Sequence, residues 1–157
     1  RRGETFVTKK IIKALVRIKM GYQKQLVLGN LDSRRDWGHA RDYVEAMWKI
    51  LQQKKPDDYV IATGKQYSIR QFINFVAKKL NMKISWKGKG LNETGYDVLS
   101  KKNIILVDRN YIRPLDVNTL LGNAAKARRE LKWKPKINIH TLIDEMITEE
   151  MNILGND

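Results

Sequence analysis

Two adjacent arginines are the residues of this chain best suited to hold a phosphate group. Arg34 and Arg35 stand in a polar loop, residues 30–38, that follows a short apolar segment. A guanidinium group offers a planar fork of donors that matches phosphate oxygens, and it stays charged throughout the physiological pH range. The loop could therefore grip a diphosphate. The alternative is a solvated basic turn with local ion pairs.

A second candidate lies between residues 111 and 116. Arg113 is followed by a proline, which restrains the chain, and Asp116 stands three residues after the arginine. Because a carboxylate can accept two hydrogen bonds from a diol, the pair could hold a phosphate and a ribose. The alternative is an exposed ion pair, which contributes less than about 1 kcal/mol to stability.

A third candidate is the basic start of the chain. Arg1 and Arg2 precede a predicted helix whose first turns carry Val7 and Lys10. The free N–H groups of a helix N-terminus attract anions, and the lysine adds charge. A frayed terminus with a solvated helix face would give the same pattern.

The overall charge raises a different possibility, a nucleic-acid-binding module. The chain of 157 residues has 31 Lys and Arg against 17 Asp and Glu, a formal charge of +14. Such a charge attracts phosphate-bearing partners in general. However, the four tryptophans do not alternate with basic residues as stacking platforms would. Trp48 in particular lies on the apolar face of a predicted helix, where we expect it to pack in the core.

Several classes of protein are excluded or disfavoured. The chain has no cysteine, which excludes a disulfide scaffold and a cysteine nucleophile and is compatible with the cytoplasm. Its two histidines are too few to indicate a metal site, and no apolar run is long enough to span a membrane. It contains no glycine-rich dinucleotide fingerprint, no P-loop and no Tyr-x-x-x-Lys pair, so it lacks a visible cofactor fingerprint and an obvious proton-transfer pair.

Hydrophobic periodicity predicts an α/β fold with short strands and several amphipathic helices. Helices are predicted over residues 5–20, 40–53, 68–80, 123–131 and 141–154, the third opened by a Ser68–Gln71 capping box. Strands are predicted over residues 25–28, 59–62, 83–86 and 104–107. Residues 87–102, rich in Gly and Lys, are predicted to form a mobile loop. These strands are too few for a complete doubly wound domain.

Taken in order, several segments resemble the GDP-mannose 4,6-dehydratase family of extended short-chain dehydrogenases/reductases. The matching segments are residues 6–11, 28–32, 35–48, 61–64, 111–114 and 126–135. The Arg-Asp-Trp-Gly-His-Ala segment that begins at Arg35 is quite specific to these dehydratases, whereas the Trp-Lys-Pro segment that ends at Pro135 is shared more widely.

The resemblance implies that residues 1–157 form a carboxy-terminal sugar-nucleotide-binding domain. In this family an amino-terminal Rossmann domain holds NADP and the catalytic residues, so the fragment alone is expected to be inactive. The complete enzyme would convert GDP-mannose to GDP-4-dehydro-6-deoxy-mannose and water, a step toward GDP-fucose. The resemblance further implies a cytoplasmic homodimer or homotetramer that binds neither nucleic acid nor membrane.

The resemblance also implies roles for individual residues. The implied contacts are Arg2 with NADP, Val7 and Lys10 with the nucleotide, Leu28 with the base, Arg35 and Arg113 with the diphosphate, and Asp116 with the ribose. Relatives often have Glu in place of Asp116, so the shorter side chain could shift the ribose contact. Two alternatives remain open: a related dehydratase, epimerase or reductase that acts on another sugar nucleotide, and the basic nucleic-acid-binding module.

Overall fold

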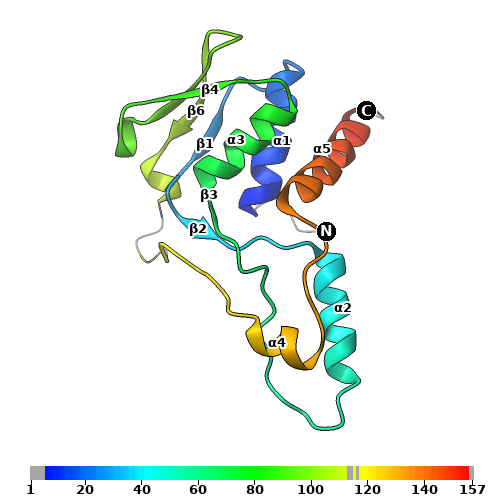
Figure 1. Ribbon diagram of the computed structural model, residues 1–157. Coiled ribbons are helices and arrows are strands. Elements are labelled where there is room, and N and C mark those ends of the chain that lie inside the picture. The colour runs from blue at the N-terminus through cyan, green and yellow to red at the C-terminus, as the bar shows by residue number, and fades with distance from the viewer. Residues whose placement is uncertain (1–5, 113–114, 116, 156–157) are drawn as a thin grey trace.

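Three helices and a four-stranded sheet form the larger part of the molecule (Figure 1). The computed structural model describes residues 6–112, 115 and 117–155. The three helices are α1 (Val7–Lys19), α3 (Ile69–Lys79) and α5 (Ile139–Gly155). They pack against one another, and their apolar faces enclose the main core together with the sheet. We refer to this part as the body.

The sheet combines parallel and antiparallel pairing in the strand order β1-β6-β5-β4. Its strands are β1 (Leu26–Leu28), β4 (Ile84–Lys87), β5 (Thr94–Asp97) and β6 (Lys102–Val107). β1 runs parallel to β6, whereas β5 runs antiparallel to both of its neighbours. The predicted α/β class is therefore confirmed.

Two helix starts follow the capping signals of the sequence. The Ser68 hydroxyl accepts the N–H of Gln71 at 3.1 Å, and the Gln71 side chain accepts the N–H of Ser68 at 2.8 Å. The capping box predicted for α3 is thus confirmed. Before α4 (Ala125–Glu130), the side chain of Asn123 accepts the N–H of Ala125 at 3.0 Å.

The last helix begins earlier than its predicted start at Thr141. The side chain of Asn138 accepts the N–H groups of both His140, at 2.9 Å, and Thr141, at 3.0 Å. Asn138 therefore takes the capping role, and Ile139 becomes the first residue of α5. An asparagine side chain can accept hydrogen bonds from the free N–H groups of a helix start, just as the predicted threonine cap would.

The predicted loop over residues 87–102 is wrong. This stretch contains a short 3₁₀ helix, η1 (Gly90–Asn92), and the strand β5 at the centre of the sheet. The residues of β5 that face inward are Gly95 and Asp97, so the strand shows no alternation of apolar side chains. Gly95 suits this position because an added Cβ would lie 2.9 Å from the side chain of Ile105 on β6.

Two further strand expectations are corrected. Residues 59–62 have no strand partner within the described ranges, so the apolar run Tyr59–Ala62 forms no strand there. In contrast, the loop predicted over residues 30–38 contains β2 (Arg34–Arg35), which pairs with β3 (Tyr67–Ser68) in a separate two-stranded sheet. Whether a segment forms a strand depends in both cases on pairing with a distant segment, which local apolarity does not indicate.

A smaller lobe extends away from the body (Figure 1) and consists mainly of α2 (Ala40–Leu51) and α4. Trp133 lies at its centre, 1% exposed, and its indole N–H donates to the backbone carbonyl of Asp42 at 2.8 Å. The buried Asp42 carboxylate accepts the N–H groups of Lys136 and Ile137, each at 3.0 Å. These bonds connect α2 to the chain that leads into α5.

The core role predicted for Trp48 is wrong in this chain, because its side chain is 60% exposed. It belongs to an apolar stripe along α2 that is exposed as a whole: Val44, Met47, Trp48 and Leu51. We call this set the α2 stripe. The helix instead buries Ala46 and partly buries Tyr43 and Ile50 against the lobe core.

The first and last described helices are joined by a partly buried ion pair. The Lys9 ammonium group on α1 lies 2.7 Å from the Glu150 carboxylate on α5, and the Glu150 side chain is 2% exposed. The two residues are separated by 141 positions in the sequence. No helix in the described part of the chain is both long and apolar enough to cross a membrane.

Candidate functional site

The candidate site lies where the parallel strands β1 and β6 end, beside the start of α1. Leu28 is the last residue of β1 and is 5% exposed, and Val107 is the last residue of β6. Open α/β sheets bind their ligands outside the carboxyl ends of the strands. The resemblance predicts that Leu28 contacts the base of the nucleotide. Its place at the carboxyl end of β1 suits that role.

The chain that follows β6 is held tightly against the end of β1. The N–H of Asp108 donates to the carbonyl of Leu28 at 2.9 Å. The Asp108 side chain then accepts the N–H of Asn110 at 2.8 Å and opens the short 3₁₀ helix η2 (Arg109–Tyr111). At Gly29 the two segments are so close that an added Cβ would stand 2.1 Å from the carbonyl oxygen of Tyr111.

This close approach brings the Tyr111 ring to Lys10. The Lys10 ammonium group lies 3.8 Å from the ring centroid, a cation–π contact between α1 and η2. Burial lowers the pKa of Lys10, because the charged form loses hydration. The sequence predicts a ligand-binding role for Lys10 but assigns none to Tyr111. The position of Tyr111 at the start of the Tyr-Ile-Arg-Pro segment is the sequence feature that could have indicated a role for it.

The start of α1 favours a negatively charged ligand. Phe6, which precedes the helix, provides no capping side chain, and the first turn contains no acidic residue. Within the described residues, which begin at Phe6, no carboxylate offsets the partial positive charge of this helix N-terminus. Val7, the first residue of α1, is half-buried and packs against the main core.

Arg35 on β2 contacts the chain at Val117, directly after the predicted ligands Arg113 and Asp116. Its Nη1 donates to the carbonyl of Val117 at 2.6 Å and to the carbonyl of Arg34 at 2.8 Å. The N–H of Arg34 also donates to the carbonyl of Asn118 at 2.8 Å. The loop after β1 and residues 117–118 thus lie side by side.

Three of the predicted site residues, Arg2, Arg113 and Asp116, lie outside the described residues. Of the others, Lys10 contacts the Tyr111 ring, and the Leu28 carbonyl accepts the N–H of Asp108, just before η2. Asp36, in the same loop as Arg35, has a structural role. Its carboxylate accepts hydrogen bonds from Thr63 and Gly64.

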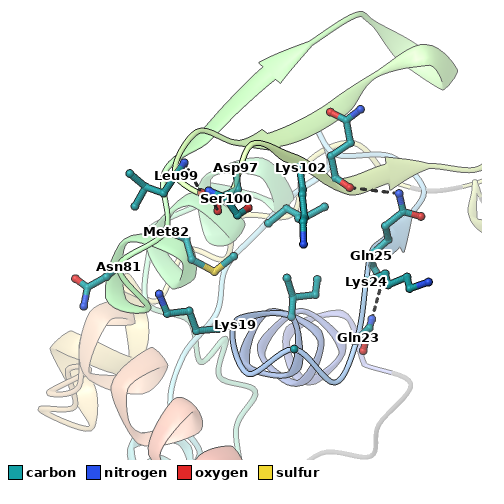
Figure 2. Close-up of a pocket in the computed structure, with 14 residues that line it drawn as sticks. Lys19, Gln23, Lys24, Gln25, Asn81, Met82, Asp97, Leu99, Ser100 and Lys102 are labelled. Carbon is teal, nitrogen blue, oxygen red and sulfur yellow. Dashed lines mark hydrogen bonds between the residues drawn. The ribbon is translucent and has the colours of Figure 1, made fainter.

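A hollow lies at the opposite end of the strands, beside the starts of β1 and β6 (Figure 2). It has a volume of about 900 Å³ and includes Lys19, Lys24 and Lys102 in its lining. The C-terminal ends of α1 and α3 meet there. Because helix C-termini carry partial negative charge, the lysines balance it, and we assign this hollow no ligand.

The buried carboxylate in this hollow is satisfied by the protein itself. Asp97 accepts N–H bonds from Lys83, Leu99 and Ser100 at 3.1, 3.4 and 3.0 Å. Burial by itself would raise the pKa of Asp97, but these hydrogen bonds prevail and lower the pKa below its ordinary value. Within the described ranges, no group of three or more His, Cys, Asp or Glu side chains could hold a metal ion.

Sequence comparison gives a uniform result. Residues 1–146 match the family model described as GDP-mannose 4,6 dehydratase. The chain is 47% identical to GDP-mannose 4,6 dehydratase 2 of Caenorhabditis elegans, covering 100% of this chain and 41% of that protein. It is 46% identical to the GDP-mannose 4,6-dehydratase of Sinorhizobium fredii, covering 98% of this chain and 44% of that protein. The chain thus spans less than half the length of these relatives.

Structure comparison shows the same fold in more distant proteins. The RMD protein of Pseudomonas aeruginosa, solved with NADPH, superposes with a TM-score of 0.76 at 19% identity, covering 97% of this chain and 44% of that chain. The dTDP-glucose 4,6-dehydratase of Bacillus anthracis, solved with NAD, gives a TM-score of 0.68 at 16% identity, covering 96% of this chain and 40% of that chain. At such identities the likeness establishes the fold alone.

Proposed function

The chain belongs to the GDP-mannose 4,6-dehydratase family, and we propose that it is the sugar-nucleotide-binding part of such an enzyme. The complete enzyme would convert GDP-mannose to GDP-4-dehydro-6-deoxy-mannose and water, a step toward GDP-fucose in the cytoplasm. The observation that carries the proposal is the basic, aromatic corner at the strand ends, where Lys10 and Tyr111 meet beside Leu28.

In this proposal the ligand is held by charge, and its base is held by apolar contact. Leu28 and Val7 would face the nucleoside, while Lys10, Arg35 and Arg113 would neutralise the diphosphate. Arginine suits this role because it can donate two parallel hydrogen bonds to one phosphate. Asp116 would accept hydrogen bonds from the ribose. Binding energy at the nucleotide would then orient the hexose for reaction.

The remainder of the enzyme would supply the chemistry. The sequence contains no glycine-rich cradle for a dinucleotide, so NADP would be held mainly by a Rossmann domain outside this chain, with Arg2 as a contact. That cofactor would supply the hydride chemistry of the dehydration. This chain alone should therefore bind nucleotide without converting GDP-mannose. The complete protein is proposed to be a homodimer or homotetramer without a nucleic-acid partner.

The α2 stripe supports the proposal that this chain packs against further protein. Four large apolar side chains spaced along one helix face are unusual on an isolated surface. We therefore expect this chain, at high concentration, to associate with itself through the α2 stripe. Leu51→Lys, at a position 80% exposed, should reduce that association.

Sedimentation velocity at several concentrations measures this association. Leu121→Lys is the matched control, since Leu121 is 60% exposed but lies off the α2 stripe. A wild-type chain that stays monomeric at the highest concentration would contradict the expectation.

Calorimetric titration of the chain with GDP, UDP and dTDP tests the proposed function. We expect GDP to bind most tightly. A preference for UDP or dTDP would favour a relative that acts on another sugar nucleotide. Equal, strongly salt-dependent binding of random RNA and DNA would instead favour the nucleic-acid module.

Arg35→Ala should weaken GDP binding by about 1–3 kcal/mol, the usual loss for a hydrogen bond to a charged group. Arg41→Ala is the matched control, because the Arg41 side chain is 73% exposed and pairs with Glu145. Calorimetry of both variants gives the comparison. Equal affinities for Arg35→Ala and wild type would remove Arg35 from the phosphate site.

A further inference from the structure

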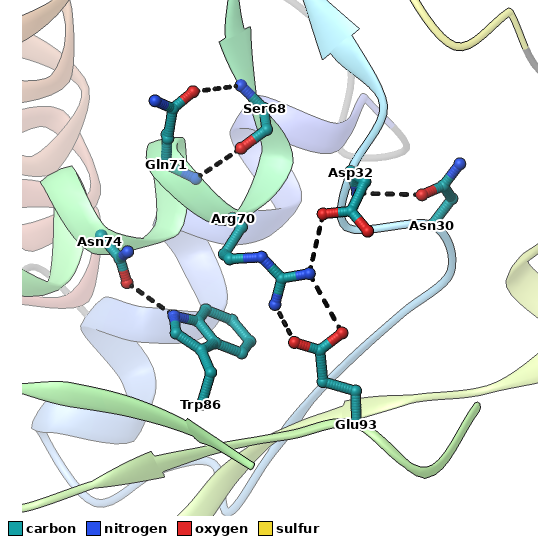
Figure 3. Close-up of polar contacts among 8 residues, drawn as sticks. All are labelled: Asn30, Asp32, Ser68, Arg70, Gln71, Asn74, Trp86 and Glu93. Atoms are coloured by element: carbon teal, nitrogen blue, oxygen red, sulfur yellow. Dashed lines mark hydrogen bonds and ion pairs between the residues drawn. The ribbon is translucent and has the colours of Figure 1, made fainter. Parts of the chain in front are cut away.

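A partly buried cluster of charged residues is centred on Arg70, the second residue of α3 (Figure 3). Its guanidinium group makes a two-pronged contact with the Glu93 carboxylate, which includes an Nη2–Oε2 distance of 3.1 Å. Nη2 also donates to Asp32 at 2.8 Å. The guanidinium lies over the Trp86 ring at 4.9 Å, and the Trp86 indole N–H donates to Asn74 at 3.1 Å.

These contacts engage both the N–H donors and the flat face of the Arg70 guanidinium, more than a surface ion pair would. The Arg70 side chain is 23% exposed and the Glu93 side chain is 11% exposed, so both charges have lost much of their hydration. Such a pair is maintained only where the geometry is good, and a planar fork stacked on an aromatic ring provides it. Asp32 is different, because its side chain is 78% exposed.

The cluster joins three parts of the chain that are distant in sequence. Arg70 belongs to α3, Glu93 precedes β5, and Asp32 belongs to the loop after β1. The backbone strengthens the same connection: the N–H of Arg70 donates to the carbonyl of Leu31 at 3.0 Å, and the N–H of Ile69 donates to the carbonyl of Ser33 at 3.2 Å. The start of α3 therefore holds residues 31–33 in place.

The loop that is held in this way leads directly into Arg35. Asp32 precedes Arg35 by three residues, and the loop enters β2 at Arg34. A long arginine side chain binds a diphosphate well only if its backbone is fixed, since small displacements cost much of the interaction. The geometry therefore connects the buried cluster to the phosphate contact.

We propose that Arg70 is a positioning residue for the sugar-nucleotide site, acting through Asp32 and the loop of residues 31–33 to fix the backbone that presents Arg35 to the diphosphate. The proposal rests on the proposed function, in which Arg35 binds that diphosphate. It also gives a role to residues 87–102, which include Glu93 and in which no site residue is predicted from the sequence.

Replacing Arg70 itself is a poor first test, because the loss would leave the Glu93 carboxylate buried without a partner and the chain could unfold. Asp32→Asn is a more specific test than a replacement of Arg70. It removes the charge that links Arg70 to the loop, at a largely exposed position, while Glu93 keeps its partner. The matched control is Asp144→Asn, which breaks the exposed pair of Asp144 with Lys79, away from the loop.

The experiment is a double-mutant cycle on GDP affinity. It compares wild type, Asp32→Asn, Arg35→Ala and the double variant by calorimetry, with thermal unfolding recorded for each. We expect Asp32→Asn to raise the Kd for GDP about three- to tenfold in the wild-type background and less than about twofold in the Arg35→Ala background, as coupled sites behave. Asp144→Asn should leave the Kd unchanged in both.

Each outcome separates the two proposals. Equal factors in both backgrounds, or no change in either, would overturn the positioning role while leaving the nucleotide site intact. Failure of the wild-type chain to bind GDP would overturn the proposed site and, with it, the positioning role. As a second variant, Arg70→Lys keeps one charge but loses the fork. If it folds with wild-type affinity, the bidentate geometry is not required and the proposal is wrong.

Discussion

Gly29→Ala is expected to lower GDP affinity at least about tenfold and to destabilise the chain by about 1–3 kcal/mol, as overpacking does. An added Cβ would stand 2.1 Å from the Tyr111 carbonyl oxygen, 2.5 Å from its carbonyl carbon and 3.0 Å from the Ile112 nitrogen. All three are backbone atoms, so no side-chain rotation relieves the clash. The η2 segment must move, and the Tyr111 ring then leaves Lys10.

Calorimetry with GDP and thermal unfolding measure the two effects together. Gly155→Ala is the matched control, because an added Cβ there meets nothing within 4 Å and Gly155 ends the last helix far from the strand ends. Wild-type affinity in Gly29→Ala would show that the contact between β1 and η2 does not shape the ligand site.

Trp133→Ala is expected to cost about 3–5 kcal/mol, the usual range for truncating a buried tryptophan. The indole fills the core of the smaller lobe at 1% exposure, and its N–H satisfies the backbone carbonyl of Asp42. Truncation leaves both a cavity and a buried carbonyl without its partner. We expect α2 and α4 to lose their packing while the body keeps its own core.

Denaturant unfolding gives the free energy, and amide hydrogen exchange shows which helices open. Trp48→Ala is the matched control within the same lobe, since that side chain is 60% exposed. It should change stability by less than about 0.5 kcal/mol, as surface substitutions do. Equal costs for the two tryptophans would contradict the packing described for the lobe.

Local signals predict the helices of this chain well. The capping box at Ser68 and Gln71 and the apolar stripe through Ile11 and Leu15 are short-range features, and the structure uses both as expected. The strands are harder, because a strand exists only through its neighbour. Residues 59–62 are apolar enough for a strand, but no partner pairs with them within the described part of the chain.

The difference between local signals and long-range contacts also separates the predicted site residues from those that the sequence analysis missed. Lys10, Leu28 and Arg35 stand in recognisable motifs and could be named from the sequence. The contact of Lys10 with Tyr111 depends on how closely η2 approaches Gly29, which no local pattern reports. The Arg70–Glu93 pair likewise joins residues 23 positions apart across two folded elements. Such contacts are known only once the chain is folded.

The pairing of Lys9 with Glu150 also constrains the order in which the body can form. Within this chain α1 precedes every other described element, yet one of its partners is α5, the last described helix. During synthesis the apolar face of α1 must therefore wait for about 130 further residues before it is fully covered, and long-range contacts of this kind fold late. Until α5 is present, part of the apolar face of α1 stays exposed to solvent, so these two helices should acquire their protection in the same late step.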